Sequence, residues 1–166
     1  MIVLGVDPGG TIGWCVLDCS TTGAQPALVK AGSTRDPLEV PWRSYGVALV
    51  AVELPEGFYP SAARKGTGGA VLARTAEGLI EAARIGARIL GRAEEAGLRV
   101  LEVAAPDWRR ALGVRAGGRR AQDVDQQVAR AVPDHVRGWP PRSNAHVRDA
   151  AGVALFAARA ARVRAA

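Results

Sequence analysis

The sequence has few cysteines and few aromatic residues. Its 166 residues include two cysteines, Cys15 and Cys19, and aromatic side chains make up 5% of the chain. Two cysteines so close together cannot form a disulfide framework, and no second ligand pair near them completes a zinc site. We therefore expect two reduced thiols in a cytoplasmic protein.

Long apolar runs are also missing. No stretch approaches the roughly 20 apolar residues of a membrane span, and the N-terminus lacks the charged-then-apolar pattern of a signal peptide. Hydrophobic residues make up 48% of the sequence, as in an ordinary soluble globular protein. A chain of this length is predicted to form a single domain over residues 1–166, with no membrane partner.

Charge is unevenly distributed along the chain. The formal net charge is +6, but residues 1–60 carry three basic and six acidic side chains (net −3), and residues 61–166 carry nineteen and ten (net +9). This pattern suggests a carboxylate site set within a surface that binds a polyanion such as nucleic acid. The alternative is compositional, because nearly all the bases are Arg, as a GC-rich genome would produce.

The first apolar stretch, Ile2–Val6, predicts a short buried strand because it is rich in β-branched residues. Asp7 follows it, and Pro8-Gly9-Gly10 forces a turn before a second apolar run, Ile12–Leu17. A carboxylate at the tip of a buried strand is costly unless a metal ion or a basic group meets it. Asp7 is therefore the leading site candidate, with turn capping as the alternative of equal weight.

The rest of the chain predicts an α/β fold with a five-stranded mixed sheet, an antiparallel meander plus two parallel strands, flanked by helices. Two prolines between residues 35 and 46 allow only a short helix there. Ser143 or Asn144 can cap the last helix. The predicted elements after the first two strands are strands Ala27–Ala31, Val47–Val52 and Leu98–Ala104, and helices Val71–Ala96, Pro106 onward, Ala121–Val132 and Ala145–Arg162.

Four polar residues are predicted to converge. Glu53 ends a buried strand as Asp7 does, and carboxyl ends of parallel strands meet at one edge of a sheet. His146 and Asp149 lie three residues apart in the first turn of the last helix, although the helix dipole alone could account for Asp149. Such ligands suit Mg²⁺ or Mn²⁺. Two such ions about 3.5–4 Å apart can support phosphodiester cleavage.

The sequence resembles the RuvC family of Holliday-junction resolvases, within the RNase H-like superfamily. The resemblance covers nearly the whole chain and is most specific at its two ends. Its motifs, in order, are GVDPGGTIGWCVLD, VALVAVE, ARTAEGLIEAA, APDWRRALG, QDVDQQVARAV and HVRDAAGVALFAA.

The resemblance implies an RNase H-like fold in which Asp7, Glu53, His146 and Asp149 are the catalytic and metal-binding residues. They would hold two Mg²⁺ ions per active site, with Mn²⁺ as the alternative. Most relatives have an acid where His146 stands. His146 would then bind a metal through a ring nitrogen or act as a base, and as a ligand it should favour Mn²⁺.

The resemblance also implies contacts with DNA. In the family, basic residues after the fifth strand hold the DNA backbone, and an aromatic residue after the strand-end Glu unstacks the junction centre. Hydrophobic anchoring explains that aromatic residue equally well. The residues that fall in these regions are Arg109, Arg119, Arg120, Phe58, Tyr59, Arg64 and Lys65.

By the same resemblance we expect a structure-selective endonuclease that resolves four-way DNA junctions. Paired symmetric phosphodiester hydrolysis by a homodimer would leave 5′-phosphate and 3′-hydroxyl ends. Helix Val71–Ala96 is the expected dimer interface, with burial of the same apolar residues in the internal core as the alternative. The alternatives are a related nuclease acting on other branched DNA and a junction-binding protein that does not cut. Sugar kinases and chaperone-type ATPases open with a similar Asp-Gly hairpin, so they are a further alternative. Those enzymes need two lobes and a second phosphate loop, which 166 residues cannot supply.

Overall fold

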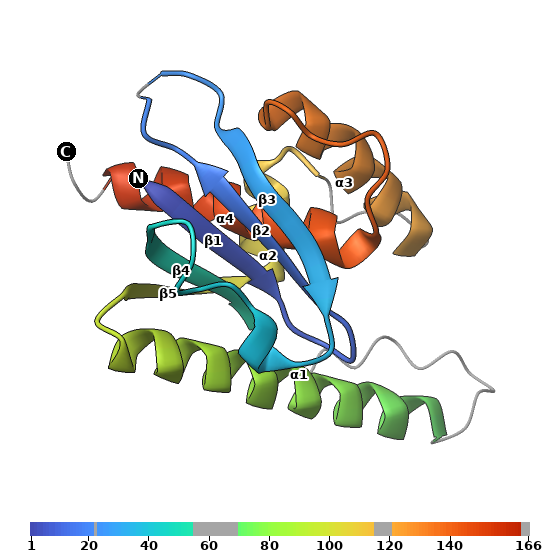
Figure 1. Ribbon diagram of the computed structural model, residues 1–166. Helices are drawn as coiled ribbons and strands as arrows, with labels where there is room; N and C mark the ends of the chain where they lie inside the picture. Colours follow the sequence, from blue (N-terminus) through green and yellow to red (C-terminus); the bar gives the residue numbers. More distant parts are fainter. Residues whose placement is uncertain (22, 55–69, 115–120, 164–166) are drawn as a thin grey trace.

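The computed structural model describes residues 1–21, 23–54, 70–114 and 121–163. One five-stranded sheet forms its centre, in the order β3-β2-β1-β4-β5 (Figure 1). The elements are β1 (Ile2–Asp7), β2 (Ile12–Asp18), β3 (Ala27–Thr34), the single-turn helix η1 (Pro37–Glu39), β4 (Val47–Leu54), α1 (Ala70–Glu95), β5 (Arg99–Ala104), α2 (Ala105–Ala111), α3 (Ala121–His135) and α4 (Ala145–Val163).

The sheet confirms the predicted mixed topology. Strands β1, β2 and β3 form an antiparallel meander, and β4 pairs in parallel with both β1 and β5. In the β1–β4 register, Val6 lies opposite Val52. Asp7 and Glu53 therefore follow paired residues and reach the same edge of the sheet.

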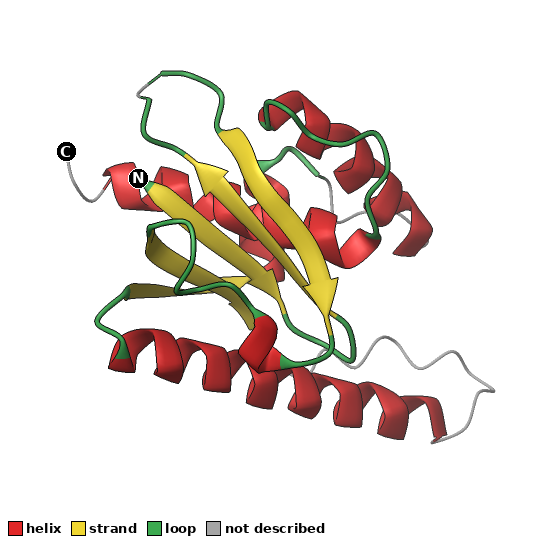
Figure 2. Cartoon of the chain, viewed as in Figure 1, coloured by secondary structure: helices red, strands yellow, loops and turns green. Residues whose placement is uncertain are grey.

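Helices cover both faces of the sheet (Figure 2). α4 crosses β1 and β2 on one face and packs against α2 and α3, whereas α1 lies on the other face, against β4, with η1 beside α1. Each face has its own apolar core, and the central strands β1 and β4 are almost fully buried between them. None of the described helices is long and apolar enough to cross a membrane.

The connection from β3 to β4 is as short as the prolines predicted. Its only regular element is η1, which begins at Pro37 after Asp36, whose side chain accepts from Leu38 N at 2.8 Å. Val40 and Trp42 follow, 2% and 7% exposed, and pack on the same side of the sheet as α1. Two apolar side chains thus cover the area that a longer crossover helix would otherwise bury.

Two predicted boundaries were wrong. β3 continues three residues beyond Ala31, to Thr34, because its pairing with β2 persists as far as Ile12. α3 does not stop at Val132 but continues through Pro133 to His135. Proline lacks only its own N–H, so the helix loses one donor there and still closes with Val136 N donating to Val132 O at 3.0 Å.

Candidate active site

Two glycines allow α4 to approach the sheet closely. A Cβ on Gly5 of β1 would lie 2.6 Å from Ala154 N, and one on Gly13 of β2 would lie 2.8 Å from His146 Cβ. Side chains at these positions would push α4 outward. Because Gly13 is paired with Asp7, the first turn of α4 lies directly beside the end of β1.

The start of α4 is fixed by Asn144. Its Oδ1 accepts from Val147 N at 2.9 Å, which caps the helix, and its Nδ2 donates to Ser33 Oγ of β3 at 3.2 Å. Of the two cap candidates in the sequence, Asn144 therefore supplies the cap. The cap ties the turn that carries His146 and Asp149 to the sheet.

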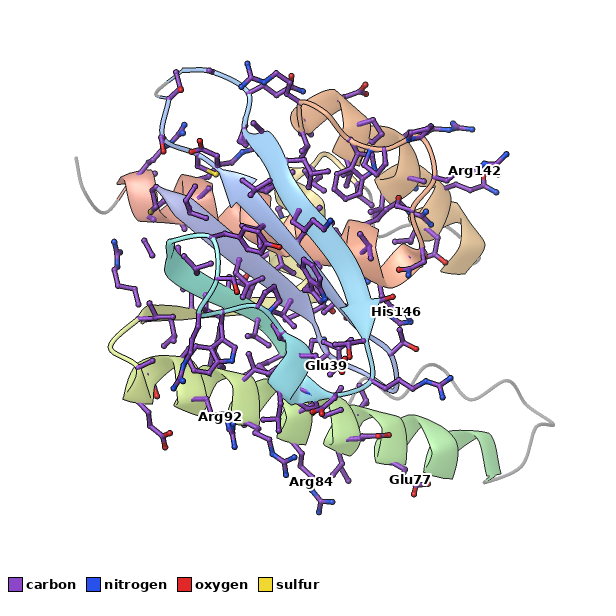
Figure 3. The ribbon with its side chains drawn as sticks, viewed as in Figure 1. Glu39, Glu77, Arg84, Arg92, Arg142 and His146 are labelled. Carbon is purple, nitrogen blue, oxygen red and sulfur yellow. The ribbon has the colours of Figure 1, made fainter. Side chains whose placement is uncertain are left out.

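His146 and Asp7 are in direct contact. Nδ1 of His146 lies 2.7 Å from Oδ2 of Asp7, although the residues are 139 positions apart. An ionised carboxylate can only accept, so with Asp7 ionised Nδ1 is the donor, and in a neutral ring the lone pair is then on Nε2. The His146 side chain is 47% exposed and the Asp7 side chain 14%. His146 lies at the sheet edge where β1 and β3 end (Figure 3).

The carboxylate of Glu53 accepts a hydrogen bond from Trp108. The indole Nε1 of Trp108, in α2, donates to Glu53 Oε2 at 2.8 Å. Trp108 is completely buried, and it is the largest fully buried side chain described. The sequence pattern gave no sign of this contact, because an apolar residue in a short helix is ordinarily read as core alone.

Burial raises the pKa of all three acids. It raises the pKa of Asp7 and of Asp149 to about 6 and that of Glu53 to about 7. Mutual repulsion adds to this effect: Asp149 raises the pKa of Asp7, Asp7 that of Glu53, and Glu53 that of Asp149. The hydrogen bond from His146 lowers the pKa of Asp7 in part. Three acids at one sheet edge are thus close enough to repel each other.

Arg109 is the arginine whose positive charge acts on all three acids. Its charge lowers the pKa of Asp7, Glu53 and Asp149. Its guanidinium lies 5.1 Å from the ring centroid of Trp108, and its buried Nε has no hydrogen-bond partner in the described part of the chain. The sequence suggested a DNA-backbone contact for Arg109, which stays a prediction. Its position beside the acids was not foreseen.

The donor set fits a divalent cation in its chemistry. Three carboxylates and one imidazole are hard or borderline ligands, and a bound cation would oppose the burial and mutual repulsion that raise the pKa values of the acids. As the side chains stand, no three His, Cys, Asp or Glu groups among the described residues are arranged to hold one ion. Holding an ion therefore requires these side chains to move closer together.

The other predicted DNA contacts cannot be placed. Phe58, Tyr59, Arg64 and Lys65 lie outside the described residues, as do Arg119 and Arg120. The clearest cavities lie elsewhere, about 360 Å³ beside Trp139 and about 420 Å³ between the β2–β3 loop and α4, and none of the four site residues lines them.

The fold is similar to that of known resolvases. No family model matches the sequence, and no curated protein matches it. RuvC of Thermus thermophilus superposes with a TM-score of 0.64 at 23% identity, covering 99% of this chain and 97% of that one.

Two further structures contain DNA. T. thermophilus RuvC in complex with a Holliday junction substrate gives a TM-score of 0.62 at 23% identity, covering 98% of this chain and 96% of that one. Fowlpox virus resolvase with Holliday junction DNA gives 0.53 at 13% identity, covering 97% and 99%. The chain therefore has the RNase H-like fold of RuvC, as its sequence resemblance predicted.

Proposed function

We propose that this protein is a metal-dependent endonuclease that cuts four-way DNA junctions. The observation that carries the proposal is the meeting of Asp7, Glu53, Asp149 and His146 at one edge of the sheet, from three elements. The similarity in fold to resolvases solved with Holliday junction DNA supports the substrate class.

Asp7, Glu53 and Asp149 would hold two divalent cations, with His146 as a further ligand or a base. Such ions supply charge stabilisation for the attacking and leaving oxygens of a phosphodiester. The pKa values of the three acids are raised toward neutral pH. A bound cation would lower these pKa values and so keep the acids ionised.

The protein side chains have defined parts in this reaction. When Nδ1 of a neutral His146 ring donates to Asp7, Nε2 carries the lone pair and can take a proton from an attacking water or bind a cation. The Arg109 guanidinium, beside the acids, can meet the phosphate being cut. Hydrolysis would leave 5′-phosphate and 3′-hydroxyl ends.

The experiment is a cleavage assay on a synthetic four-way junction with Mg²⁺ or Mn²⁺, run beside Asp7→Asn. We expect paired symmetric nicks from the wild type and none from the variant, with junction binding retained. Cutting by Asp7→Asn would refute the site assignment. A flap and a linear duplex in parallel distinguish junction resolution from cleavage of other branched DNA, and binding without nicking in either metal would indicate a non-cleaving binder.

A homodimer with α1 as its interface fits two symmetric cuts, since a four-way junction presents two equivalent strands. Ile80 on α1 supports this, because it is 53% exposed and a large apolar side chain gains by being covered. Figure 3 shows Glu77 and Arg84 projecting from the same helix away from the sheet. Sedimentation should show a dimer that Ile80→Arg dissociates and that Val163→Arg, a change at another exposed apolar residue, leaves intact.

A further inference from the structure

Trp108 occupies an unusual place for a core residue. Its side chain is completely buried, yet its one polar atom donates to Glu53 Oε2 at 2.8 Å. Burying an indole N–H without a partner is costly, so this contact satisfies the donor. A carboxylate is a stronger acceptor than a backbone carbonyl, and the bond is therefore charge-assisted when Glu53 is ionised.

The indole cannot easily turn away from Glu53, because α4 holds its other face. A Cβ added at Gly152 of α4 would lie 2.6 Å from Trp108 Cζ3, so the ring packs directly on the helix backbone. Gly152 is three residues after Asp149, on the element that carries this acid. The indole thus connects Glu53 of β4 to the helix that positions Asp149.

The hydrogen bond from Trp108 also restricts the position of the Glu53 carboxylate relative to Asp7. Asp7 and Glu53 repel each other across the sheet edge, and two like charges separate unless something holds them. Trp108 engages Oε2 of Glu53, and Oε1 is the oxygen that does not take part in this bond. A rigid donor at this place fixes the carboxylate before any ion arrives.

We propose, building on the proposed function, that Trp108 is a positioning residue: its indole N–H fixes Glu53 for divalent-cation binding and phosphodiester cleavage. Because Trp108 is completely buried, it would act through Glu53 and not by touching DNA or an ion itself. A second role follows from its packing. Any change that shifts α4 relative to α2 moves the indole, and with it Glu53.

Trp108→Phe tests the proposal, because it keeps an aromatic ring and removes the N–H. We expect Mn²⁺ affinity, measured by calorimetry without DNA, to fall by about 10–100-fold. In cleavage assays kcat should fall over the same range, and the metal concentration for half-maximal rate should rise. Junction affinity should stay unchanged, since the residue contacts no DNA. A merely structural role would lower Tm and leave the metal dependence unaltered.

Trp42→Phe is the matched control, because Trp42 is 7% exposed and lies in the core on the opposite face of the sheet. It should leave Mn²⁺ affinity at the wild-type value. Gly152→Ala is the second variant: it keeps the indole N–H but displaces the ring, and it should weaken Mn²⁺ binding as Trp108→Phe does.

The hydrogen bond can also be observed directly by NMR. The chain has four tryptophans, and the indole N–H signal missing in Trp108→Phe identifies that of Trp108. This signal should move when Mg²⁺ is added to the wild type and when Glu53 is changed to Gln. A stationary signal would overturn the proposal.

The outcomes for Trp108 and for the nuclease are distinguishable. Wild-type Mn²⁺ affinity and cleavage in Trp108→Phe would overturn the positioning role and leave the nuclease intact. A wild type that binds Mn²⁺ but cuts no DNA would overturn the proposed function, while weaker Mn²⁺ binding by Trp108→Phe would still support the positioning of Glu53.

Discussion

At the scale of single residues, His146 is where this site departs from an all-carboxylate arrangement. Imidazole is a softer ligand than carboxylate, so a site that uses it should accept Mn²⁺ more readily than Mg²⁺. The 2.7 Å contact with Asp7 orients the ring and leaves Nε2 available.

His146→Asp should therefore shift cleavage toward Mg²⁺. The Mn²⁺-to-Mg²⁺ ratio of rates, measured over a range of metal concentrations, should fall for the variant. His135→Asp, a change at the other histidine of the chain, is the control and should leave the ratio unchanged. An unchanged ratio for His146→Asp would mean that His146 is not a metal ligand.

The three buried acids should make the metal-free protein sensitive to rising pH. Burial raises the pKa values of Asp7 and Asp149 to about 6 and that of Glu53 to about 7, whereas in the unfolded chain these groups ionise near their ordinary values of 3.8 and 4.5. The stability gained by retaining these protons is full below the unfolded values and is lost as the pH rises through the folded ones. We expect Tm in EDTA to fall between about pH 5 and pH 8.

Glu53→Gln is the control for this prediction, because an amide does not titrate in that range. Its Tm should depend less on pH, and at pH 8 it should exceed that of the wild type. Saturating Mg²⁺ should remove most of the wild-type loss, since the ion binds the ionised acids. A wild-type Tm that rises from pH 5 to pH 8 in EDTA would contradict the prediction.

The residue contacts differ in how far the sequence could predict them. Asp7 and Glu53 could be placed together because each follows a buried strand and the strands are parallel. The indole of Trp108 could not be assigned to Glu53, because the direction of one buried ring depends on packing between α2 and α4. The position of Arg109 depends on that same packing.

At the scale of elements, the close packing of α4 on β1 and β2 is what assembles the site. Gly13→Ala should lower the free energy of unfolding by about 1–3 kcal/mol, because the new methyl group meets the backbone of His146. It should also lower cleavage more than junction binding, since His146 and Asp149 move away from Asp7. Denaturant unfolding and single-turnover cleavage measure the two effects.

Gly91→Ala is the matched control for that change. Its added Cβ would meet nothing within 4 Å, and Gly91 lies inside α1. Replacing Gly by Ala in a helix should raise stability by about 0.5–1 kcal/mol, and because Gly91 is remote from the acids, the ratio of cleavage to junction binding should stay unchanged. Equal destabilisation by the two substitutions would refute the role given to Gly13.

Element order could be predicted where the sequence carries a strong local pattern. Ile2–Val6, Ile12–Leu17 and Val47–Val52 are apolar runs bounded by turn residues, and each forms the expected strand. The end of α3 was missed because proline removes a helical N–H donor and ordinarily ends a helix, whereas Pro133 lies inside this one. Edge strand β3 was predicted too short because its outer residues are half exposed.

At the scale of the whole molecule, the charge distribution allows two explanations that salt dependence can separate. The net of +9 over residues 61–166 reflects either a surface for DNA or the Arg bias of the genome. Cations that contact phosphates release counterions, so binding weakens steeply with salt, whereas scattered surface charges off the interface contribute little.

We expect junction affinity to fall by about 10³–10⁵-fold between 50 and 200 mM salt, the range for 6–10 phosphate contacts. Fluorescence anisotropy with a labelled junction, in Ca²⁺ to prevent cutting, measures the slope of log affinity against log salt. Because counterion release does not depend on sequence, junctions of different sequence should give equal slopes. A slope that corresponds to only one or two phosphate contacts would mean that the basic composition reflects the Arg bias of the genome. Junction recognition would then have to depend on DNA shape and on the metal bound by the acids.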